Sequence, residues 1–420
     1  MNEIAKQETA ARTASFFDRP NVEMEHIAIG PGIPLGIERV YNPEVGIGGA
    51  YGAWGNAYNN DALPGFLEDR IGQTLPDDER LSLGELGFES RHHVPHLSLA
   101  EHDALETHVG VRLLQAAIRA CGWEPGEVQA LLLGMTAPIS LDYTERIARA
   151  AGIPENALKV SVHKACDGSV GGLNLALNPH LPAALHLPSN LAAELTGKKV
   201  LVGGIEALSR FLGPARDLQA LQLFGNGAGI IGLVPGKTMK FLAGGTREAY
   251  DEEGVLQVAM AYPHSGDRNV PLEVTETGAN NLRIAGLMHE PDDGSVPVKM
   301  AGPMGMVKLF VRTGVMTVHD VYQSYVRRMA ELGTPSKEIA VAIAHHANYK
   351  INQIKGKHLE KEGIRLQMPW LLRDFGNVSA ASNMIGFLRK LVDLHPGDNV
   401  MFDGFGAGTY YDVVTVELGQ

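Results

Sequence analysis

Apolar positions along the chain predict an alternation of helices and strands. They recur at helical spacing over residues 103–121, and the apolar run VQALLLGM follows directly. Such a change of period predicts a helix and then a buried strand. The same alternation continues through KVSVHKAC, DGSVGGLNLAL, KKVLVGGIEAL and GIIGLVPG. This order favours a layered α/β core.

A second set of similar elements occupies residues 301–420. It begins with the helical pattern MVKLFVRTGVMTVHDVYQSYVRRM and continues with the strand-like run VAIAHHAN. In this set GNVSAASNMIGFLRKL corresponds to CDGSVGGLNLAL, and NVMFDGFGAG corresponds to KVLVGGIEAL. The chain is therefore predicted to contain two related halves, although a repeat this faint also arises by chance in α/β proteins.

Two stretches lie outside this pattern. Residues 1–80 are rich in glycine, proline and asparagine, and are predicted to form an N-terminal arm of extended chain and loops over a neighbouring surface. Residues 235–300 carry GTREAYDEEG, PHSGDRN and HEPDDGS, and are predicted to form hairpins or a cap that shapes an entrance. The two halves are then residues 81–234 and residues 301–420.

Composition narrows the possible classes of protein. With 420 residues the chain exceeds the ~250–300 at which one core stops growing, so two fused lobes are expected. No apolar run is long enough for a membrane span or a secretory signal, which predicts a soluble cytoplasmic protein. Only two cysteines occur, so no disulfide framework is expected. The net charge of −12 argues against nucleic-acid binding.

Cys166, in KACDGSVGG, is the candidate nucleophile. It follows a strand-like run and precedes a helix-compatible segment, so its sulfur is expected at a helix N-terminus. The partial positive charge there stabilises a thiolate and lowers a cysteine pKa from ~8.5 toward ~7 or below. A buried structural thiol is the alternative, and Cys121 keeps that interpretation because it falls on the apolar face of its helix.

The histidines offer a second group of candidates. His345 and His346 end a predicted buried strand, where α/β proteins place their ligand sites, although a lone histidine there is more often structural. His92, His93 and His96, in RHHVPH, suggest a metal, yet no Asp, Glu or Cys completes a familiar ligand spacing. No metal site is predicted.

Two polar turns add weaker signals. Asn377, in DFGNVSAAS, follows a glycine in a tight elbow before a helix, where an N-cap or an Asx-turn is the ordinary role. The loop GFGAGTYYD offers backbone N–H groups that suit an oxyanion but are equally common in a plain turn. Neither turn assigns a function by itself.

In chain order, KACDGSVGGL, GGIEALSR, LFGNGAG, AHHANYKI, GNVSAAS and GFGAG resemble the motif series of the ketoacyl-ACP synthase III family, within the thiolase superfamily. The match covers residues 84–234 and 301–420. This resemblance implies a five-layered α-β-α-β-α fold built from two related halves. It also implies a homodimer.

The resemblance further implies the active site. The family's cysteine, histidine and asparagine fall on Cys166, His345 and Asn377. The backbone N–H groups of Cys166 and Ala407 match its oxyanion hole. By resemblance, Cys166 takes an acyl group from acyl-CoA or acyl carrier protein, and His345 and Asn377 bind a malonyl thioester while it loses carbon dioxide. No cofactor beyond these thioester substrates is implied.

Four positions depart from the family pattern. Leu81 and Glu85 stand where a tryptophan and an arginine clamp coenzyme A in the best-known members, and a carboxylate there would repel the nucleotide phosphates. His346 replaces a common glutamine, and Asp167 follows the nucleophile where a small residue is frequent. The identities of donor and acceptor therefore stay open.

Lys350 and Lys357 match basic positions that face the acyl carrier protein in the family, and a solvated helix face is the alternative. The implied function is decarboxylating condensation in fatty-acid, lipid or polyketide-type biosynthesis. One alternative moves the acyl group to a hydroxyl or amine, or condenses acyl thioesters without decarboxylation. Another is a non-catalytic subunit, against which the intact Cys, His and Asn set speaks.

Overall fold

The computed structural model describes most of the chain. The described residues are 22–29, 32–136, 138–181, 187, 189–212, 218–248, 256–258, 263–267, 269–270, 272–287, 298–300, 310–407 and 410–419. None of the helices in these ranges is both long enough and apolar enough to cross a bilayer.

The larger sheet has nine strands in the order β1-β2-β3-β9-β8-β6-β7-β13-β12. Their bounds are β1 (Val22–Ile29), β2 (Ile33–Asn42), β3 (Ile47–Trp54), β6 (Ala130–Gly134), β7 (Leu158–His163), β8 (Val200–Glu206), β9 (Gly227–Leu233), β12 (Leu272–Gly278) and β13 (Asn281–Gly286). Strands β13, β7, β6 and β8 run parallel. Every residue of β6, β8 and β9 is buried, which explains why these strands read as continuous apolar runs.

The smaller sheet has four strands in the order β10-β17-β16-β15. They are β10 (Met239–Glu248), β15 (Ile339–Ala344), β16 (Asn399–Gly406) and β17 (Tyr410–Leu418). Two short ribbons pair β4 (Asn56–Asn59) with β5 (Ser90–His93), and β11 (Leu256–Val258) with β14 (Val298–Met300).

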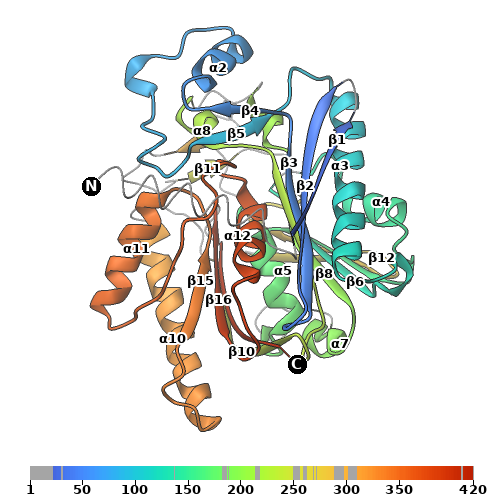
Figure 1. Ribbon diagram of the computed structural model, residues 1–420, viewed down its shortest axis with the longest axis vertical. Coiled ribbons are helices and arrows are strands. Elements are labelled where there is room, and N and C mark those ends of the chain that lie inside the picture. Colours follow the sequence, from blue (N-terminus) through green and yellow to red (C-terminus); the bar gives the residue numbers. More distant parts are fainter. Residues whose placement is uncertain are drawn as a thin grey trace.

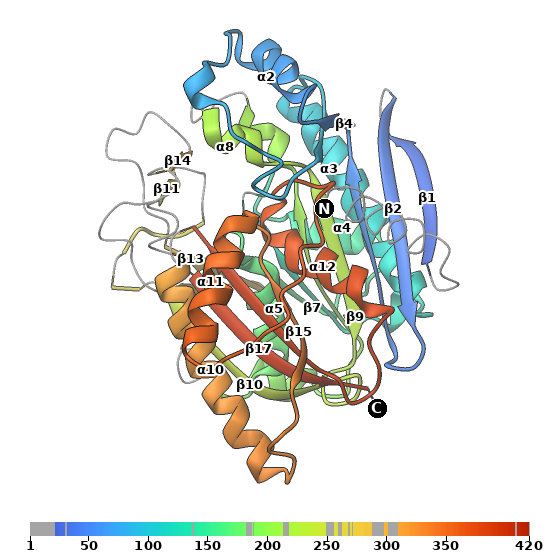
Figure 2. The same cartoon turned by 60° about the vertical axis from the view of Figure 1, so that its left-hand side comes forward.

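Helices form three layers around these two sheets (Figures 1 and 2). The outer face of the larger sheet is covered by α3 (Leu99–Ala120) and α4 (Tyr143–Ala150), and that of the smaller sheet by α10 (Arg312–Glu331) and α11 (Tyr349–Lys361). Between the sheets lie α5 (Gly168–Leu177) and α12 (Ser382–Leu391), one from each predicted half. All ten residues of α5 are buried, as expected for a helix that is apolar all round. The predicted α-β-α-β-α fold is confirmed.

Smaller elements gather at one end of the sheets. Figure 1 shows α2 (Leu63–Ile71) and α8 (Leu218–Leu223) beside β4 and β5 there. Their leucines form a separate apolar cluster with Phe88. The short helix α7 (Leu191–Leu195) lies against α5.

The prediction of an N-terminal arm is wrong for the described part of residues 1–80. Strands β1, β2 and β3 continue the larger sheet, and β3 is buried along its whole length. Its glycines suggested loops, but they allow close packing: a Cβ on Gly49 would lie 2.3 Å from the Ile230 carbonyl oxygen and 2.8 Å from Leu388. Residues 1–21 lie outside the described part of the chain.

The predicted insertion at residues 235–300 is partly core, which corrects the expectation of a surface cap. Strand β10 pairs with β17 inside the smaller sheet. Strands β12 and β13 do form a hairpin, and β13 pairs in parallel with β7. The segment HEPDDGS and the part of GTREAYDEEG after residue 248 lie outside the described residues.

Candidate active site

The chain bends sharply between β7 and α5, and Cys166 lies in this bend. Asp167 is the N-cap of α5, so the sulfur lies at a helix N-terminus, as predicted. Ala165, just before the cysteine, has a φ of +47°. A non-glycine residue in the left-handed region costs about 1–3 kcal/mol, and such strain is common at functional sites. The bend is therefore held by the surrounding structure.

The environment of the thiol corrects one expectation. Burial raises the pKa of the Cys166 thiol to about 12, while hydrogen bonds from Ser379 and from the Ala407 N–H oppose the rise. The prediction of a lowered pKa is wrong because the loss of solvation on burial penalises the thiolate. At neutral pH the sulfur is a thiol and must lose a proton before it can attack.

Asn377 lies in the segment 376–382, directly before α12. Its side-chain oxygen accepts a hydrogen bond from the Ser379 N–H at 2.9 Å, the geometry of an Asx-turn. This contact leaves the side-chain NH₂ of Asn377 as the available donor. Ser379 has a φ of +43°, and its hydroxyl donates to the Cys166 sulfur at 3.1 Å. One residue therefore links Asn377 to Cys166.

His345 follows the last residue of β15. Its backbone N–H donates to the Asp403 backbone carbonyl at 2.9 Å, and its ring Nδ1 lies 2.5 Å from the Ser382 hydroxyl. Burial, together with the neighbouring His346 and Lys355, lowers the pKa of His345 to about 3, so the imidazole is neutral. If Ser382 donates to Nδ1, then Nε2 carries the proton and can donate to a substrate.

A buried ion pair supports the backbone that carries His345. Lys355 Nζ, on α11, lies 2.6 and 2.5 Å from the two carboxylate oxygens of Asp403 on β16. Burial raises the pKa of Asp403, and Lys355 opposes this rise. Asn352, also on α11, donates to the His345 carbonyl at 3.1 Å. These contacts fix α11 and β16 on either side of the histidine.

Two backbone N–H groups converge near the sulfur. The Ala407 N–H donates to Cys166 Sγ, and a Cβ on Gly406 would lie 2.9 Å from the Cys166 nitrogen. Only glycine allows so close an approach. This arrangement suits an oxyanion hole formed by Cys166 and Ala407, which stays a prediction.

The segment 376–382 brings the three predicted residues together. It contains Asn377, and its two serines, Ser379 and Ser382, reach Cys166 and His345 respectively. The site therefore lies where the two central helices begin. The catalytic role of each residue stays a prediction.

Two residues of this site were missed in the sequence. Thr136 and Glu206 lie near the carboxyl ends of the parallel strands β6 and β8. The Thr136 hydroxyl donates to Glu206 Oε1 at 2.7 Å and also contacts the Ser379 hydroxyl. A signal was present, because polar residues that end buried parallel strands mark the usual ligand edge of such sheets.

Comparisons with known proteins agree in sequence and in fold. A family model described as 3-oxoacyl-[acyl-carrier-protein] synthase III C terminal matches residues 329–418. The beta-ketoacyl-[acyl-carrier-protein] synthase III of Clostridioides difficile is 24% identical over 302 residues, or 69% of this chain and 77% of that protein. The 3-oxoacyl-[acyl-carrier-protein] synthase III structure from Aquifex aeolicus has a TM-score of 0.59 at 17% identity and covers 94% of this chain and 100% of its own.

The same fold occurs in polyketide synthases. The C-terminal type III polyketide synthase domain of Steely1 from Dictyostelium has a TM-score of 0.61 at 12% identity, covering 90% of this chain and 99% of its own. The relative that matches in sequence is named beta-ketoacyl-[acyl-carrier-protein] synthase III, and the shared fold extends over nearly the whole chain. The C-terminal part of this chain is similar to the 3-oxoacyl-[acyl-carrier-protein] synthase III family, and nearly the whole chain shares the fold of its solved relatives.

Asp167 belongs to a buried charge cluster. Lys164 Nζ contacts Asp412, lies 2.8 Å from Glu248 and 3.6 Å from Asp167. Burial alone would lower the pKa of Lys164, but Asp412, Glu248 and Asp167 raise it well above its usual value. Burial and then Asp412 raise the pKa of Asp167, while Lys164 opposes the rise. The unusual acid beside the nucleophile is thus a member of this cluster.

The two predicted carrier-binding lysines are both exposed on α11. Lys350 Nζ lies 2.7 Å from the Glu85 carboxylate, which therefore has its own cation. Leu81, the other departure at this entrance, donates its N–H to Gln222 at 3.0 Å. The ion pair thus partly neutralises both the negative charge of Glu85 and the positive charge of Lys350.

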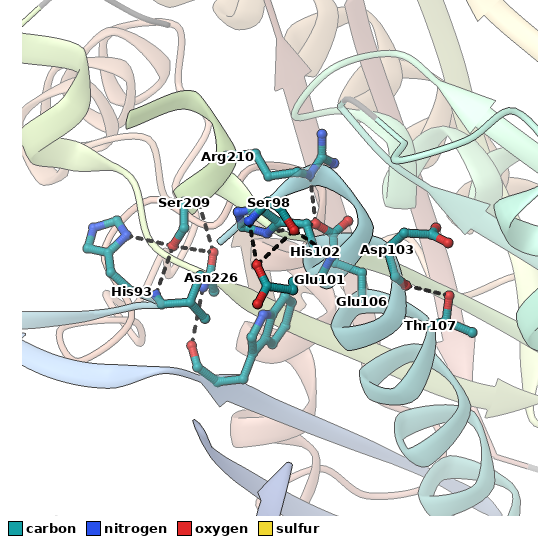
Figure 3. Close-up of polar contacts among 12 residues, drawn as sticks. His93, Ser98, Glu101, His102, Asp103, Glu106, Thr107, Ser209, Arg210 and Asn226 are labelled. Carbon is teal, nitrogen blue, oxygen red and sulfur yellow. Dashed lines mark hydrogen bonds and ion pairs between the residues drawn. The ribbon is translucent and has the colours of Figure 1, made fainter. Parts of the chain in front are cut away.

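His346 and His93 have structural contacts. His346 accepts a hydrogen bond from the Leu371 N–H at 3.0 Å and packs on Trp370. His93 Nδ1 lies 3.0 Å from the Ser209 hydroxyl (Figure 3). Across the ranges that the structure describes, no group of three or more His, Cys, Asp or Glu side chains is arranged to hold a metal ion.

The segment GGIEALSR is held by polar contacts to α3 and to the loop before β9. Arg210 donates to Glu106 Oε1 at 2.7 Å, and the Ser209 hydroxyl donates to Asn226 at 3.0 Å (Figure 3). These contacts anchor the residues that follow Glu206 at the end of β8.

Proposed function

We propose that this protein is a decarboxylating condensing enzyme that carries an acyl group on Cys166 and joins it to a malonyl unit. The observation that carries this proposal is the segment 376–382, which supplies Asn377 and contacts both Cys166 and His345. A nucleophile with two neutral donors beside it suits acyl-enzyme and enolate chemistry. The names of the relatives support the same reaction.

In the proposed first half-reaction, the Cys166 sulfur attacks the carbonyl carbon of an acyl-CoA or acyl-carrier thioester. The carbon–sulfur bond of the donor breaks, and the donor leaves as a thiol that carries the proton of Cys166. The N–H groups of Cys166 and Ala407 bind the oxygen on which negative charge develops. This half-reaction needs no cofactor.

In the proposed second half-reaction, His345 Nε2–H and the Asn377 NH₂ donate to the thioester carbonyl of the malonyl unit. Carbon dioxide leaves, and its bonding electrons form an enolate whose oxygen these two donors stabilise. The enolate carbon then attacks the acyl carbon, and the Cys166 thiolate departs. A neutral His345 fits this role, and one preorganised donor is typically worth about 3–4 kcal/mol.

The proposal is tested by incubating the protein with a panel of acyl-CoA and acyl-carrier thioesters, followed by intact-mass analysis. Labelled malonyl thioester is then added, and released carbon dioxide is collected. An acyl adduct followed by carbon dioxide and a ketoacyl product is expected. An adduct that passes to a hydroxyl or amine without carbon dioxide release would favour the acyltransferase alternative, and no adduct with any donor would remove the proposal.

The proposed partners are the acyl carrier protein and a second copy of the chain. The homodimer was first expected partly because an N-terminal arm would need a surface to cover. That reason falls away because residues 22–54 contribute strands to the sheet. The homodimer stays a prediction based on the family resemblance.

Charge reversal on α11 should separate the carrier protein from small thioesters. We expect Lys357→Glu to slow acylation by an acyl-carrier thioester on the order of ten-fold at low ionic strength, and to leave acylation by a small thioester unchanged, since only the larger partner senses the patch. Lys350→Glu should have a smaller effect because Glu85 already pairs with Lys350. Single-turnover acylation rates provide the measurement.

A matched control is Lys237→Glu, which makes the same charge change in the exposed turn between β9 and β10. This turn lies at the end of β9 that points away from the site, so the control should react at the wild-type rate with both donors. Equal losses with carrier and small thioester in Lys357→Glu would remove the docking proposal.

A further inference from the structure

We propose that Glu206 is the proton acceptor for the Cys166 thiol when the acyl group is transferred. The proton passes through the hydroxyl groups of Ser379 and Thr136, which lie between them. This inference rests on the proposed function only in that acylation is the step it serves. It gives a role to Glu206, Ser379 and Thr136, which have none in the reaction described above.

The contacts between the thiol and the carboxylate are continuous. Cys166 Sγ and the Ser379 hydroxyl are 3.1 Å apart, and the Ser379 hydroxyl contacts Thr136 Oγ1. Thr136 Oγ1 donates to Glu206 Oε1 at 2.7 Å. These residues come from the bend before α5, the short helix Ser379–Ala381, the end of β6 and the end of β8. Four separate elements therefore converge on one row of hydrogen bonds.

Glu206 is buried, and no cation among the described residues forms an ion pair with it. Its Oε1 accepts the N–H of Thr136 at 2.8 Å and that of Ala380 at 3.2 Å, in addition to the Thr136 hydroxyl. Among the described residues, the titratable group at the other end of the row is the Cys166 thiol. Burial raises the pKa of Glu206 to about 7, and the hydrogen bonds from Thr136, Ala380 and Ser379 oppose the rise. A group with a pKa near the operating pH can both accept and return a proton.

His345 is a poorer acceptor for the same proton. Its pKa is lowered to about 3 by burial, so its imidazole binds a proton far more weakly than the Glu206 carboxylate does. Its Nδ1 is also occupied by the Ser382 hydroxyl. The two groups therefore divide the work, with Glu206 serving the thiol and His345 serving as a neutral donor.

Backbone strain is concentrated where the row meets the sulfur. In the described part of the chain, the non-glycine residues with left-handed φ are Ala165 and Ser379. They lie on either side of the contact between Cys166 and Ser379. Strain retained at both sides of one contact indicates that its geometry is needed.

The transfer balances without any further reactant. As Sγ bonds to the acyl carbon, the thiol proton passes to Ser379, the Ser379 proton to Thr136, and the Thr136 proton to Glu206. The donor carbon–sulfur bond breaks, and the proton held by Glu206 then passes to the departing thiolate, which leaves as a thiol. For this transfer the Ser379 hydroxyl first turns toward Thr136 from the sulfur, to which it donates in the structure.

A purely structural role for Glu206 is the alternative, because its carboxylate also anchors the N–H groups of Thr136 and Ala380. Glu206→Gln separates the two roles. The amide oxygen still accepts these hydrogen bonds, but it cannot take up a proton at neutral pH. Ser379→Ala breaks the row at the residue that contacts the sulfur and leaves Glu206 in place, whereas Thr136→Ser keeps a hydroxyl at the same position.

The test compares two reactions of Cys166 by peptide mass analysis. The first is acetylation by S-phenyl thioacetate, which requires no recognition of a nucleotide or a carrier. The second is alkylation by iodoacetamide, which reports the thiolate already present. In Glu206→Gln we expect acetylation at pH 7 to fall about 100-fold. Alkylation should stay equal or rise, because the Glu206 charge raises the pKa of the thiol.

The hydroxyl variants and the pH profile complete the test. Ser379→Ala should lose acetylation as Glu206→Gln does, and Thr136→Ser should retain it. Because only the ionised carboxylate accepts a proton, wild-type acetylation should rise through pH about 7 and then level off, and Glu206→Gln should lack this step.

The relay would be overturned if Glu206→Gln were acetylated at the wild-type rate. It would also be overturned if Glu206→Gln and Thr136→Ser both lost acetylation and alkylation to the same extent. Failure of the wild-type protein to form acetyl-Cys166 would remove both the relay and the proposed function. Acetylation with no later carbon dioxide release from malonyl thioester would remove only the proposed function.

Discussion

Replacing Cys166 by alanine is expected to abolish every covalent acyl adduct. Within the site, Cys166 is the residue that can form a thioester, and the contacts of Ser379 and Ala407 converge on its sulfur. Intact-mass analysis after incubation with acyl thioesters measures the adduct directly. The expected result is a mass equal to that of the unreacted chain with every donor that modifies the wild-type protein.

The matched control is the second cysteine. Cys121 is the C-cap residue of α3, and burial raises the pKa of its thiol to about 12. It lies among Gly232 and Trp123, away from the segment 376–382. Cys121→Ala should keep the full adduct. An adduct that persists in Cys166→Ala and disappears in Cys121→Ala would reverse the assignment of the nucleophile.

Replacing His345 or Asn377 by alanine should leave the acyl adduct detectable but slow condensation by roughly 100-fold or more. Each variant loses one donor to the enolate oxygen, and losses of this size are typical for a single oxyanion donor. Acylation is kept because the oxyanion hole predicted for that step uses the N–H groups of Cys166 and Ala407. Adduct mass and carbon dioxide release from malonyl thioester measure the two half-reactions separately.

His358, exposed near the end of α11, provides the matched histidine control. His358→Ala should carry out both half-reactions at the wild-type rate. The prediction would be contradicted if the His345→Ala variant no longer formed the acyl adduct but still decarboxylated malonyl thioester. His345 would then act mainly as a base for the cysteine, and Glu206 would lose its proposed role.

Local pattern in the sequence predicted the layered architecture well. Strands β6 and β8 are buried on both faces, so their apolar runs are visible without any knowledge of their neighbours. The bend that carries Cys166 was also predictable, because it lies between a strand-like run and a helix-compatible segment. The motif series then placed His345 and Asn377 in the same family pattern.

The features that were missed depend on contacts between distant residues. The glycines of strand β3 suggested a loop. They are needed because Ile230 and Leu388 approach the strand closely, and local sequence does not reveal these contacts. Thr136 and Ser379 lie 243 residues apart, yet their hydroxyls meet beside the nucleophile. The raised pKa of Cys166 likewise comes from burial in the folded chain.

The hairpin of β12 and β13 limits how copies of this protein can associate. Both sides of β7 are hydrogen-bonded within the chain, to β6 and to β13. The sheet therefore ends at β12, where Thr275, Glu276 and Thr277 are exposed. A polar, charged outer strand discourages edge-to-edge pairing with another molecule. While this hairpin is in place, β7 is not available to pair with a second copy, so the predicted homodimer would need another face.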